Sequence, residues 1–280
     1  MEKIKLISWN VNGIRAIEKK SALKWIDKED IHFLGIQEIK SQISQIPSTI
    51  FNKKYKHLIA SESEIKGRSG TALFTDFDLS YSDICNRVDI LNEGRINEVH
   101  FTFSNKDIVL FNVYFPNGQS KEERLTYKMG FYDRFLDYCE ELRTKGKSII
   151  ICGDVNTAHK PIDLARPKQN EKVSGFLPME REWIDKLLDK GYIDTFREIN
   201  GDLEDKYSWW GYRGFNKKIK NPDTGEITKV YVTPREENIG WRIDYFFISE
   251  DLKQNLEEAF ILDNVMGSDH CPIGITLKKI

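Results

Sequence analysis

The sequence predicts an α/β protein in which two β-sheets pack together with helices on the outside. Apolar strand-like runs and segments with helical periodicity alternate along the 280 residues, a pattern typical of strands connected by helices. Several strand-like runs also follow one another directly, and a short polar turn joins residues 96–103 to 108–115, which indicates antiparallel pairing. Mixed pairing with covering helices favours two packed sheets.

Composition indicates one domain spanning residues 1–280. The chain is 40% apolar and 12% aromatic, which is enough to bury a sizeable core. It has no low-complexity linker and no repeat at a solenoid period. The four cysteines are widely spaced without a CxxC pair, which argues against a zinc cluster or a disulfide framework and favours reduced thiols.

Charge and hydropathy limit the expected cellular location and the kinds of binding partner. The sequence shows no secretory leader pattern and no apolar run near the roughly 20 residues of a membrane span. We therefore expect a soluble, cytoplasmic protein that does not bind membranes. The net charge of -2 gives no global basic field, so any nucleic-acid site must be a local patch.

The first third of the chain predicts three strands and a helix. Residues 4–9 form a short apolar run that enters a polar turn, and residues 21–30 read as a helix with Ser21 as its N-cap. Residues 31–37 form a second buried strand, which leads directly into a carboxylate. Residues 69–75 read as a further strand.

The middle of the chain predicts a hairpin followed by a helix and a buried strand. Residues 96–103 and 108–115 are its two strands, joined by the polar turn at 104–107. Residues 122–143 carry apolar and aromatic side chains at helical spacing, and residues 147–152 form an apolar strand aimed at a polar loop.

The last third predicts a helix and two closing strands. Residues 178–190 read as a helix with Gly191 just past its end, where glycine commonly stops helices. Residues 240–249 and 271–277 are the closing strands.

Seven polar residues follow or end these apolar strands, and they could meet at one end of the sheet pair. They are Asn10, Glu38, Asp154, Asn156, Asp244, Asp269 and His270. One such residue alone more often caps a turn, but seven together favour a site. Carboxylate and amide oxygens without thiolates suit Mg²⁺, or Mn²⁺ as a substitute, better than zinc.

Six motifs in order resemble those of the exonuclease III family of apurinic/apyrimidinic endonucleases. The motifs are 9–13 (WNVNG), 37–40 (QEIK), 114–118 (YFPNG), 153–158 (GDVNTA), 241–245 (WRIDY) and 267–272 (GSDHCP). The resemblance covers essentially the whole chain. It implies a four-layered α/β sandwich with two mixed sheets face to face and helices on both outer sides. It also implies Mg²⁺-dependent cleavage of DNA 5′ to abasic sites, with 3′-phosphodiesterase and 3′→5′ exonuclease activity.

The resemblance also implies roles for the polar residues. Asp154 is the expected general base, Asn156 orients the water and a phosphate oxygen, and Asp244 orients His270, which clamps the phosphate. The expected metal ligands are Asn10, Glu38, Asp154, Asn156 and Asp269. Tyr114 could donate to the phosphate or serve as an ionised base, and the sequence leaves both open. Asn12 stands where many relatives carry an aspartate, which puts the number of metal ligands in doubt.

Positions that match DNA-contacting residues of the family predict the DNA interface, although each could also be an ordinary solvated side chain. They are Arg15, Lys20, Lys40, Arg68, Arg95, Asn117, Arg124 and Asn170. Trp209, Trp210 and Trp241 would wall a pocket for the flipped, base-free sugar. Gly175 leaves its mouth uncrowded, and Tyr212 with Arg213 could form a wedge into the duplex.

The expected partner is duplex DNA with abasic or 3′-blocked sites, bound by a monomer. Two other functions stay open. One is a phosphoesterase of the same fold acting on inositol phosphates or sphingomyelin, and the other is a DNA-damage-binding module without catalysis.

Residues 214–238 predict an inserted hairpin. Residues 217–220 and 227–232 could be its strands, and 221–225 has the proline, aspartate and late glycine of a turn. A mobile surface loop is the alternative. The segment is rich in lysine, which favours a place beside DNA.

Overall fold

Two six-stranded sheets form the centre of the computed structural model, which describes residues 1–280 except 52–54, 83–84, 120, 221 and 223–225. The first sheet has the order β13-β14-β1-β2-β4-β3, with β1 (Lys3–Asn10), β2 (Phe33–Gln37), β3 (His57–Ser61), β4 (Thr71–Thr75), β13 (Leu256–Ile261) and β14 (Ile273–Lys278). The second has the order β5-β6-β7-β8-β12-β9, with β5 (Ser80–Ser82), β6 (Ile96–Phe103), β7 (Lys106–Tyr114), β8 (Ser148–Asp154), β9 (Tyr192–Asp194) and β12 (Asp244–Ser249). The pairs β1–β2 and β7–β8 are parallel and the other pairs are antiparallel.

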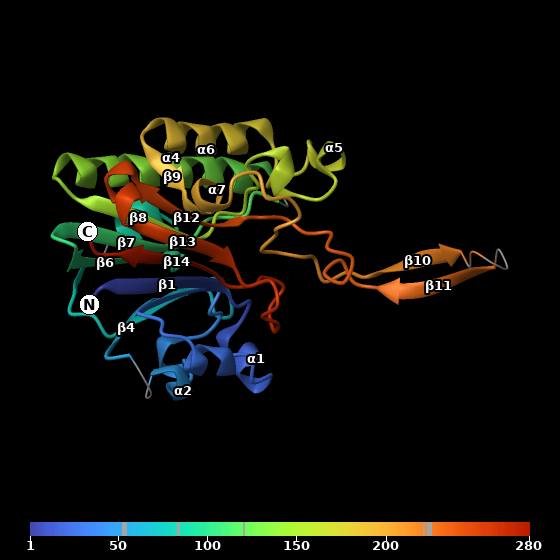
Figure 1. Cartoon of the computed structure of the whole chain (residues 1–280), viewed down its shortest axis with the longest axis horizontal. Helices are drawn as coiled ribbons and strands as arrows, with labels where there is room; N and C mark the ends of the chain where they lie inside the picture. Colours follow the sequence, from blue (N-terminus) through green and yellow to red (C-terminus); the bar gives the residue numbers. More distant parts are fainter. Residues whose placement is uncertain (52–54, 83–84, 120, 221, 223–225) are drawn as a thin grey trace.

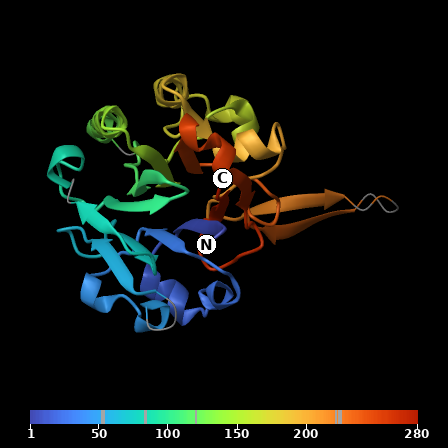
Figure 2. The same ribbon diagram turned by 60° about the vertical axis from the view of Figure 1, so that its left-hand side comes forward.

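Helices cover the outer face of each sheet, so the molecule has four layers (Figures 1 and 2). The long helices α4 (Glu122–Thr144) and α6 (Pro178–Asp189) pack on the second sheet. The first sheet is covered by shorter elements, α1 (Ile14–Lys19), η1 (Lys24–Lys28) and α2 (Ser48–Phe51). The remaining helical elements are η2 (Ile43–Gln45), α3 (Cys85–Val88), η3 (Pro161–Asp163), α5 (Pro167–Asn170), α7 (Thr195–Asn200) and η4 (Glu250–Asn255). The predicted four-layered sandwich is confirmed.

The sheets face each other across an apolar core that includes one polar cluster. Phe33 and Leu73 of the first sheet share a buried cluster with Leu110 and Ile150 of the second. Nearby, the buried Asn112 side chain on β7 donates to backbone carbonyls of β2 and β4, and its Oδ1 accepts from Gln37 Nε2 at 2.5 Å. A buried amide of this kind holds a single arrangement only when its hydrogen bonds are made. These bonds therefore tie the two sheets together.

The prediction of a helix over residues 21–30 was wrong. Ser21 adopts a left-handed φ of 55° rather than capping a helix, and η1 follows as a 3₁₀ helix. Leu23 and Ile26 are three residues apart, a spacing that suits a 3₁₀ turn as well as an α-helix. The α-helix of this region is α1, which starts directly after Gly13.

The other differences lie mainly at sheet edges and strand ends. β3, β5, β9 and β13 were not predicted, because these strands are short or interrupted by polar residues. The closing strands also start later than predicted, at Asp244 and Ile273. Residues 240–243 are not a strand, and Trp241 instead forms isolated bridges with Leu164 and Trp209. Within the described ranges, no helix is both long and apolar enough to cross a bilayer.

Residues 214–238 include a two-stranded ribbon separate from both sheets. Its strands are β10 (Phe215–Lys220) and β11 (Ile227–Val232), which pair antiparallel. β11 has the predicted bounds, whereas β10 begins two residues before the predicted start at residue 217. Of the turn predicted at 221–225, only Pro222 lies inside the described residues. The ribbon projects away from the sandwich, beyond the edge at which β1 ends (Figure 1). We refer to β10 and β11 together as the arm.

Candidate active site

Strand register brings the predicted site residues to one edge of the sandwich. Asp154, the last residue of β8, is paired with Tyr114 on β7 and with Asp244 on β12. On the facing sheet, Asn10 ends β1 and lies opposite Gln37, which is followed by Glu38. Polar side chains therefore gather where buried strands of both sheets end.

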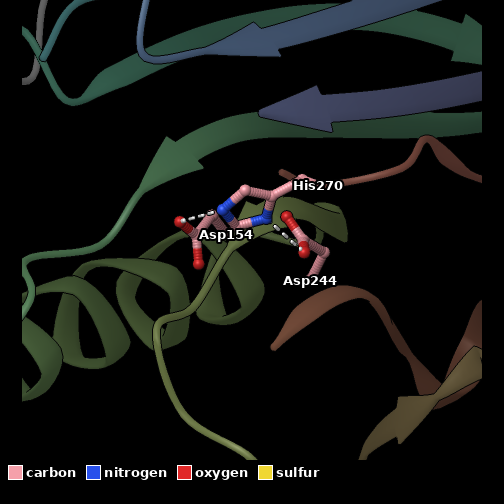
Figure 3. Close-up of side chains that lie close together, drawn as sticks. All are labelled: Asp154, Asp244 and His270. Atoms are coloured by element: carbon pink, nitrogen blue, oxygen red, sulfur yellow. Dashed lines mark hydrogen bonds and ion pairs between the residues drawn. The ribbon is translucent and has the colours of Figure 1, made fainter. Parts of the chain in front are cut away.

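His270 lies between two buried carboxylates (Figure 3). Its Nδ1 is 2.8 Å from Asp244 Oδ2, and its Nε2 is 3.8 Å from Asp154 Oδ2. All three side chains are at most 5% exposed. Ser208 Oγ also donates to Asp244 Oδ2 at 2.6 Å, which fixes the carboxylate that orients the imidazole.

Burial and charge shift the protonation of this cluster. Burial opposes the charged imidazolium, but Asp244 and Asp154 outweigh it and raise the pKa of His270 to about 10. Burial opposes the charged form of Asp154 as well and so raises the pKa of this carboxyl group above its ordinary value, although the His270 charge partly opposes this shift. The arrangement therefore favours a charged histidine beside a carboxyl group whose proton affinity suits acid–base chemistry near neutrality.

Side-chain amides connect the carboxylates of the two sheets. Asn10 Nδ2 donates to Asp154 Oδ2 at 2.9 Å and to Glu38 Oε1 at 3.1 Å. Asn156, just past β8, donates from its backbone nitrogen to Asp154 Oδ1 at 2.8 Å and lies with Nδ2 3.2 Å from Oδ2. Asn117 in turn donates to Asn156 Oδ1 at 3.1 Å. These bonds hold the Asp154 carboxylate in one orientation.

A cation already lies among the oxygens that could hold a metal. The Lys40 ammonium is 2.6 Å from Glu38 Oε2 and also donates to Asn12 Oδ1. Asn12 in turn donates to Asp269 Oδ1 at 2.9 Å. This group offers carboxylate and amide oxygens and already stabilises one positive charge, so its chemistry fits a hard divalent ion. The cluster of Asp154, Asp244 and His270 is also compact enough for a metal, but a protonated histidine is not a ligand.

Five of the predicted DNA-contacting residues line one cavity of about 550 Å³ beside Glu38 and Tyr114. They are Lys40, Arg68, Arg95, Asn117 and Arg124. Arg95 and Arg124 both pair with Glu93 inside it, at 2.6 and 3.0 Å. The cavity is therefore lined by several cations whose charge is only partly neutralised.

The structure separates the other three predicted contacts from this cavity. Arg15 lines an adjoining cavity of about 220 Å³. Lys20 Nζ donates to the backbone carbonyl of Gly267, next to the His270 loop, at 2.9 Å. Asn170, the last residue of α5, donates to the carbonyls of Ala165 and Arg166, which directly precede that helix.

Two of the three predicted pocket tryptophans lie together beside the site. Trp209 and Trp241 meet edge to face with ring centroids 6.3 Å apart, and Trp209 Nε1 donates to Asp269 Oδ2 at 3.1 Å. Gly175 has a left-handed φ of 101°, and a Cβ there would lie 3.2 Å from the Trp241 ring. Trp210 departs from the prediction because it is 4% exposed and packs in a separate cluster. Adjacent residues of an extended chain point to opposite sides.

Tyr212 lies at the mouth of the site and Arg213 follows it in an exposed position. The Tyr212 hydroxyl accepts from the backbone nitrogen of Asp269 at 3.1 Å, yet the residue is 63% exposed. An aromatic ring held at one end and exposed at the other is compatible with the predicted wedge.

Sequence reasoning missed supporting residues around the site. Ser208 was not predicted, and Lys128 forms a fully buried ion pair with Glu180 at 2.6 Å while donating to the Asn156 carbonyl at 2.8 Å. A lysine on the apolar stripe of residues 122–143 is the signal that could have identified the second group, because a buried ammonium requires a partner.

Comparisons with known proteins identify the family of this chain. The model of the endonuclease/exonuclease/phosphatase family matches residues 7–270. An exodeoxyribonuclease of Bacillus subtilis is 38% identical over 279 residues, covering 98% of this chain and 100% of that protein. The DNA repair nuclease APEX1 of Danio rerio is 35% identical over 277 residues, covering 98% and 82%.

A solved structure shares the same fold. The AP endonuclease LMAP from Leishmania major superposes with a TM-score of 0.80 at 25% identity, over 100% of this chain and 89% of that one. The chain therefore belongs to the endonuclease/exonuclease/phosphatase family, within its branch of exodeoxyribonuclease and apurinic/apyrimidinic endonuclease enzymes.

Proposed function

We propose that this chain hydrolyses duplex DNA on the 5′ side of abasic sites in a Mg²⁺-dependent reaction, and that it also cleans blocked 3′ ends. One observation carries the proposal: a buried Asp154 carboxylate that Asn10 and Asn156 hold in place next to a cationic His270. Hydrolysis of a phosphodiester needs such a base for water and such a charge for the phosphate. The names of the relatives support DNA repair as the setting.

Asp154 and His270 divide the work of the attack between them. Asp154 accepts a proton from the water that attacks phosphorus, because its raised pKa makes it a stronger base near neutral pH than an ordinary carboxylate. Asn156 orients that water and a phosphate oxygen. His270 stays charged and stabilises the negative charge that develops on the phosphate oxygens.

Glu38 is the principal metal ligand in this proposal, with Asn10, Asp154, Asn156 and Asp269 around it. When bound, the divalent ion supplies charge neutralisation at the phosphate and at the departing 3′ oxygen. Asn12, in the position where the family resemblance expects an aspartate, contributes a neutral oxygen. The site would therefore hold a divalent ion with one negative charge fewer than a site with an aspartate at position 12.

Tyr114 acts as a donor rather than as a base. Burial and the nearby Glu38 carboxylate raise its pKa well above the ordinary value. A phenol in this environment keeps its proton, so it can donate to a phosphate oxygen.

The aromatic group beside the site selects the abasic sugar. Trp209, Trp241 and Phe176 form a small apolar wall. A nucleotide without its base loses little stacking when it leaves the helix and needs little room. An intact nucleotide would collide with this wall, and Gly175 keeps the wall close to the Asn156 backbone.

Cleavage of a duplex with one tetrahydrofuran abasic analogue tests the proposal. This analogue has no aldehyde, so it can be cut only by hydrolysis. We expect one cut 5′ to the analogue with Mg²⁺, no cut in EDTA, and slow 3′-end trimming of an intact duplex. Binding without cleavage would indicate a damage-binding module, whereas hydrolysis of inositol phosphates or sphingomyelin instead of DNA would indicate the other phosphoesterases of this fold.

A further inference from the structure

The arm presents two unlike faces. In its register, Lys218 lies directly opposite Lys229, and Asn216 lies opposite Tyr231 on the same face. The other face carries Phe215 opposite Val232, Lys217 opposite Val230 and Ile219 opposite Thr228. Because side chains alternate along a strand, the lysine pair and Tyr231 point the same way. We call this the cationic face, defined by Lys218, Lys229 and Tyr231.

Within the described part of the chain, no carboxylate neutralises the lysine charges of the cationic face. Lys217, on the other face, pairs with Glu237 at 2.5 Å, whereas neither Lys218 nor Lys229 has a carboxylate partner there. Like charges directly across a strand pair destabilise it. Tyr231 is also 67% exposed, so this face combines uncompensated charge with an open aromatic ring.

The base of the arm is attached to the active-site loop. The Arg235 guanidinium donates to the carbonyls of Asp263, Val265 and Ser268 at 2.9, 2.7 and 3.0 Å, and it lies 4.5 Å above the Trp210 ring. Trp210 in turn donates its backbone N–H to the Asp269 carbonyl at 3.0 Å. These contacts fix the base of the arm to the loop that directly precedes the catalytic histidine.

Beyond that base the arm stands free. Among the residues that the structure describes, the arm pairs with neither six-stranded sheet, and a two-stranded ribbon alone in water is only marginally stable. Six residues of strand extend about 20 Å, which corresponds to about six base pairs of duplex. The base of the arm contacts the loop just before His270, so duplex DNA that extends from a phosphate at His270 can reach the arm.

We infer that the cationic face of the arm binds the phosphate backbone of duplex DNA on one flank of the cleaved site, and so lengthens the footprint of the enzyme. The inference rests on the proposed function, because it takes the active site as the place where DNA is cut. A ribbon of two strands fits a DNA groove, and the lysine pair supplies the backbone contacts. Other positions of the arm add apolar contact without sequence preference.

The test compares the double variant Lys218→Gln/Lys229→Gln with a matched control. Lys3 and Lys278 form another cross-strand lysine pair, between β1 and β14 at the far end of the sandwich, so Lys3→Gln/Lys278→Gln removes the same charge elsewhere. Dissociation constants for a long tetrahydrofuran duplex are measured in EDTA over a series of salt concentrations. Two lost phosphate contacts should reduce the salt slope by about 2 and weaken binding about tenfold or more.

Shortening the DNA gives an independent readout. Trimming one flank to fewer than about four base pairs should weaken the wild type and remove its difference from the arm variant, whereas trimming the other flank should preserve that difference. An arm variant with the wild-type affinity and salt slope would overturn the inference, and so would an equal loss in the control. Cleavage of the same duplex by the wild type with Mg²⁺ is scored separately, because failure there would contradict the proposed function rather than the arm.

Discussion

Asp154 and Asp244 are register partners on the neighbouring antiparallel strands β8 and β12, and His270 lies between their carboxylates. Two buried carboxylates this close would be unfavourable alone, because like charges repel strongly in a poorly solvated site. The positive charge of the His270 imidazolium offsets this repulsion, and the two carboxylates in turn stabilise that charge. The pair is therefore a device that keeps His270 cationic.

Asp244→Asn should move the alkaline limit of activity to lower pH. The wild-type His270 pKa is raised to about 10, so the charged form persists through neutral and mildly alkaline pH. Removing the Asp244 charge lowers that pKa towards the ordinary value near 6.5, and the imidazolium is then lost at lower pH. The checks are the pH dependence of single-turnover cleavage and the titration of His270 by NMR. An unchanged histidine titration in the variant would refute the role of Asp244.

Glu38→Gln should weaken metal binding more than catalysis. Glu38 is one of three carboxylates among the proposed ligands, so its loss should raise the Mg²⁺ concentration needed for half-maximal cleavage, and excess Mg²⁺ or Mn²⁺ should restore part of the rate. The measurement is the cleavage rate over a metal titration. If added metal restores nothing, Glu38 is not a ligand.

Asp163→Asn should destabilise the fold in a pH-dependent way. Asp163 is buried between Arg242 and Arg197, with Oδ1 2.8 and 2.5 Å from their nitrogens. Burial opposes its ionisation, but the two arginines outweigh it and lower the pKa of Asp163 to about 2. Breaking a buried pair on one side costs about 3 to 5 kcal/mol, which denaturant unfolding at neutral pH should show.

The sign of the acid dependence follows from the lowered pKa. The ionised Asp163 contributes stability above its unfolded pKa near 3.8, and this contribution is lost as pH falls towards about 2. The wild type should therefore lose its advantage over the variant below pH 4. A difference in unfolding free energy between the two proteins that stays the same across this pH range would contradict this role of the ionised Asp163.

Much of the site could be predicted because strand ends are visible in sequence. Asn10, Glu38 and Asp154 each follow an apolar run, and the fold then places the ends of those strands at one edge. The pairing of strands far apart in the chain is not visible in this way. Register makes Asp154 and Asp244 neighbours, and the family resemblance rather than periodicity suggested that Asp244 orients His270.

Residues that act through tertiary contacts escaped prediction. Ser208 has no local signal because its partner Asp244 is 36 residues away. The sequence does not distinguish Trp210 from the adjacent Trp209, but the alternation of side chains places the two in different clusters. Short edge strands were missed because β13, for example, carries Glu257 and Glu258 in its six residues. Burial decided these features, and a single sequence reveals burial only through long periodic runs.

The central claim is that Asp154 activates the water that cleaves DNA. Asp154→Asn preserves the shape of the side chain and its place beside Asn10, but it removes the proton acceptor. The direct measurement is single-turnover cleavage of a tetrahydrofuran duplex at saturating enzyme and saturating Mg²⁺, with DNA affinity measured in parallel. We predict a rate lower by about 10² to 10⁴, no rescue by added metal, and DNA binding close to that of the wild type. Near-normal turnover in this variant would contradict the account.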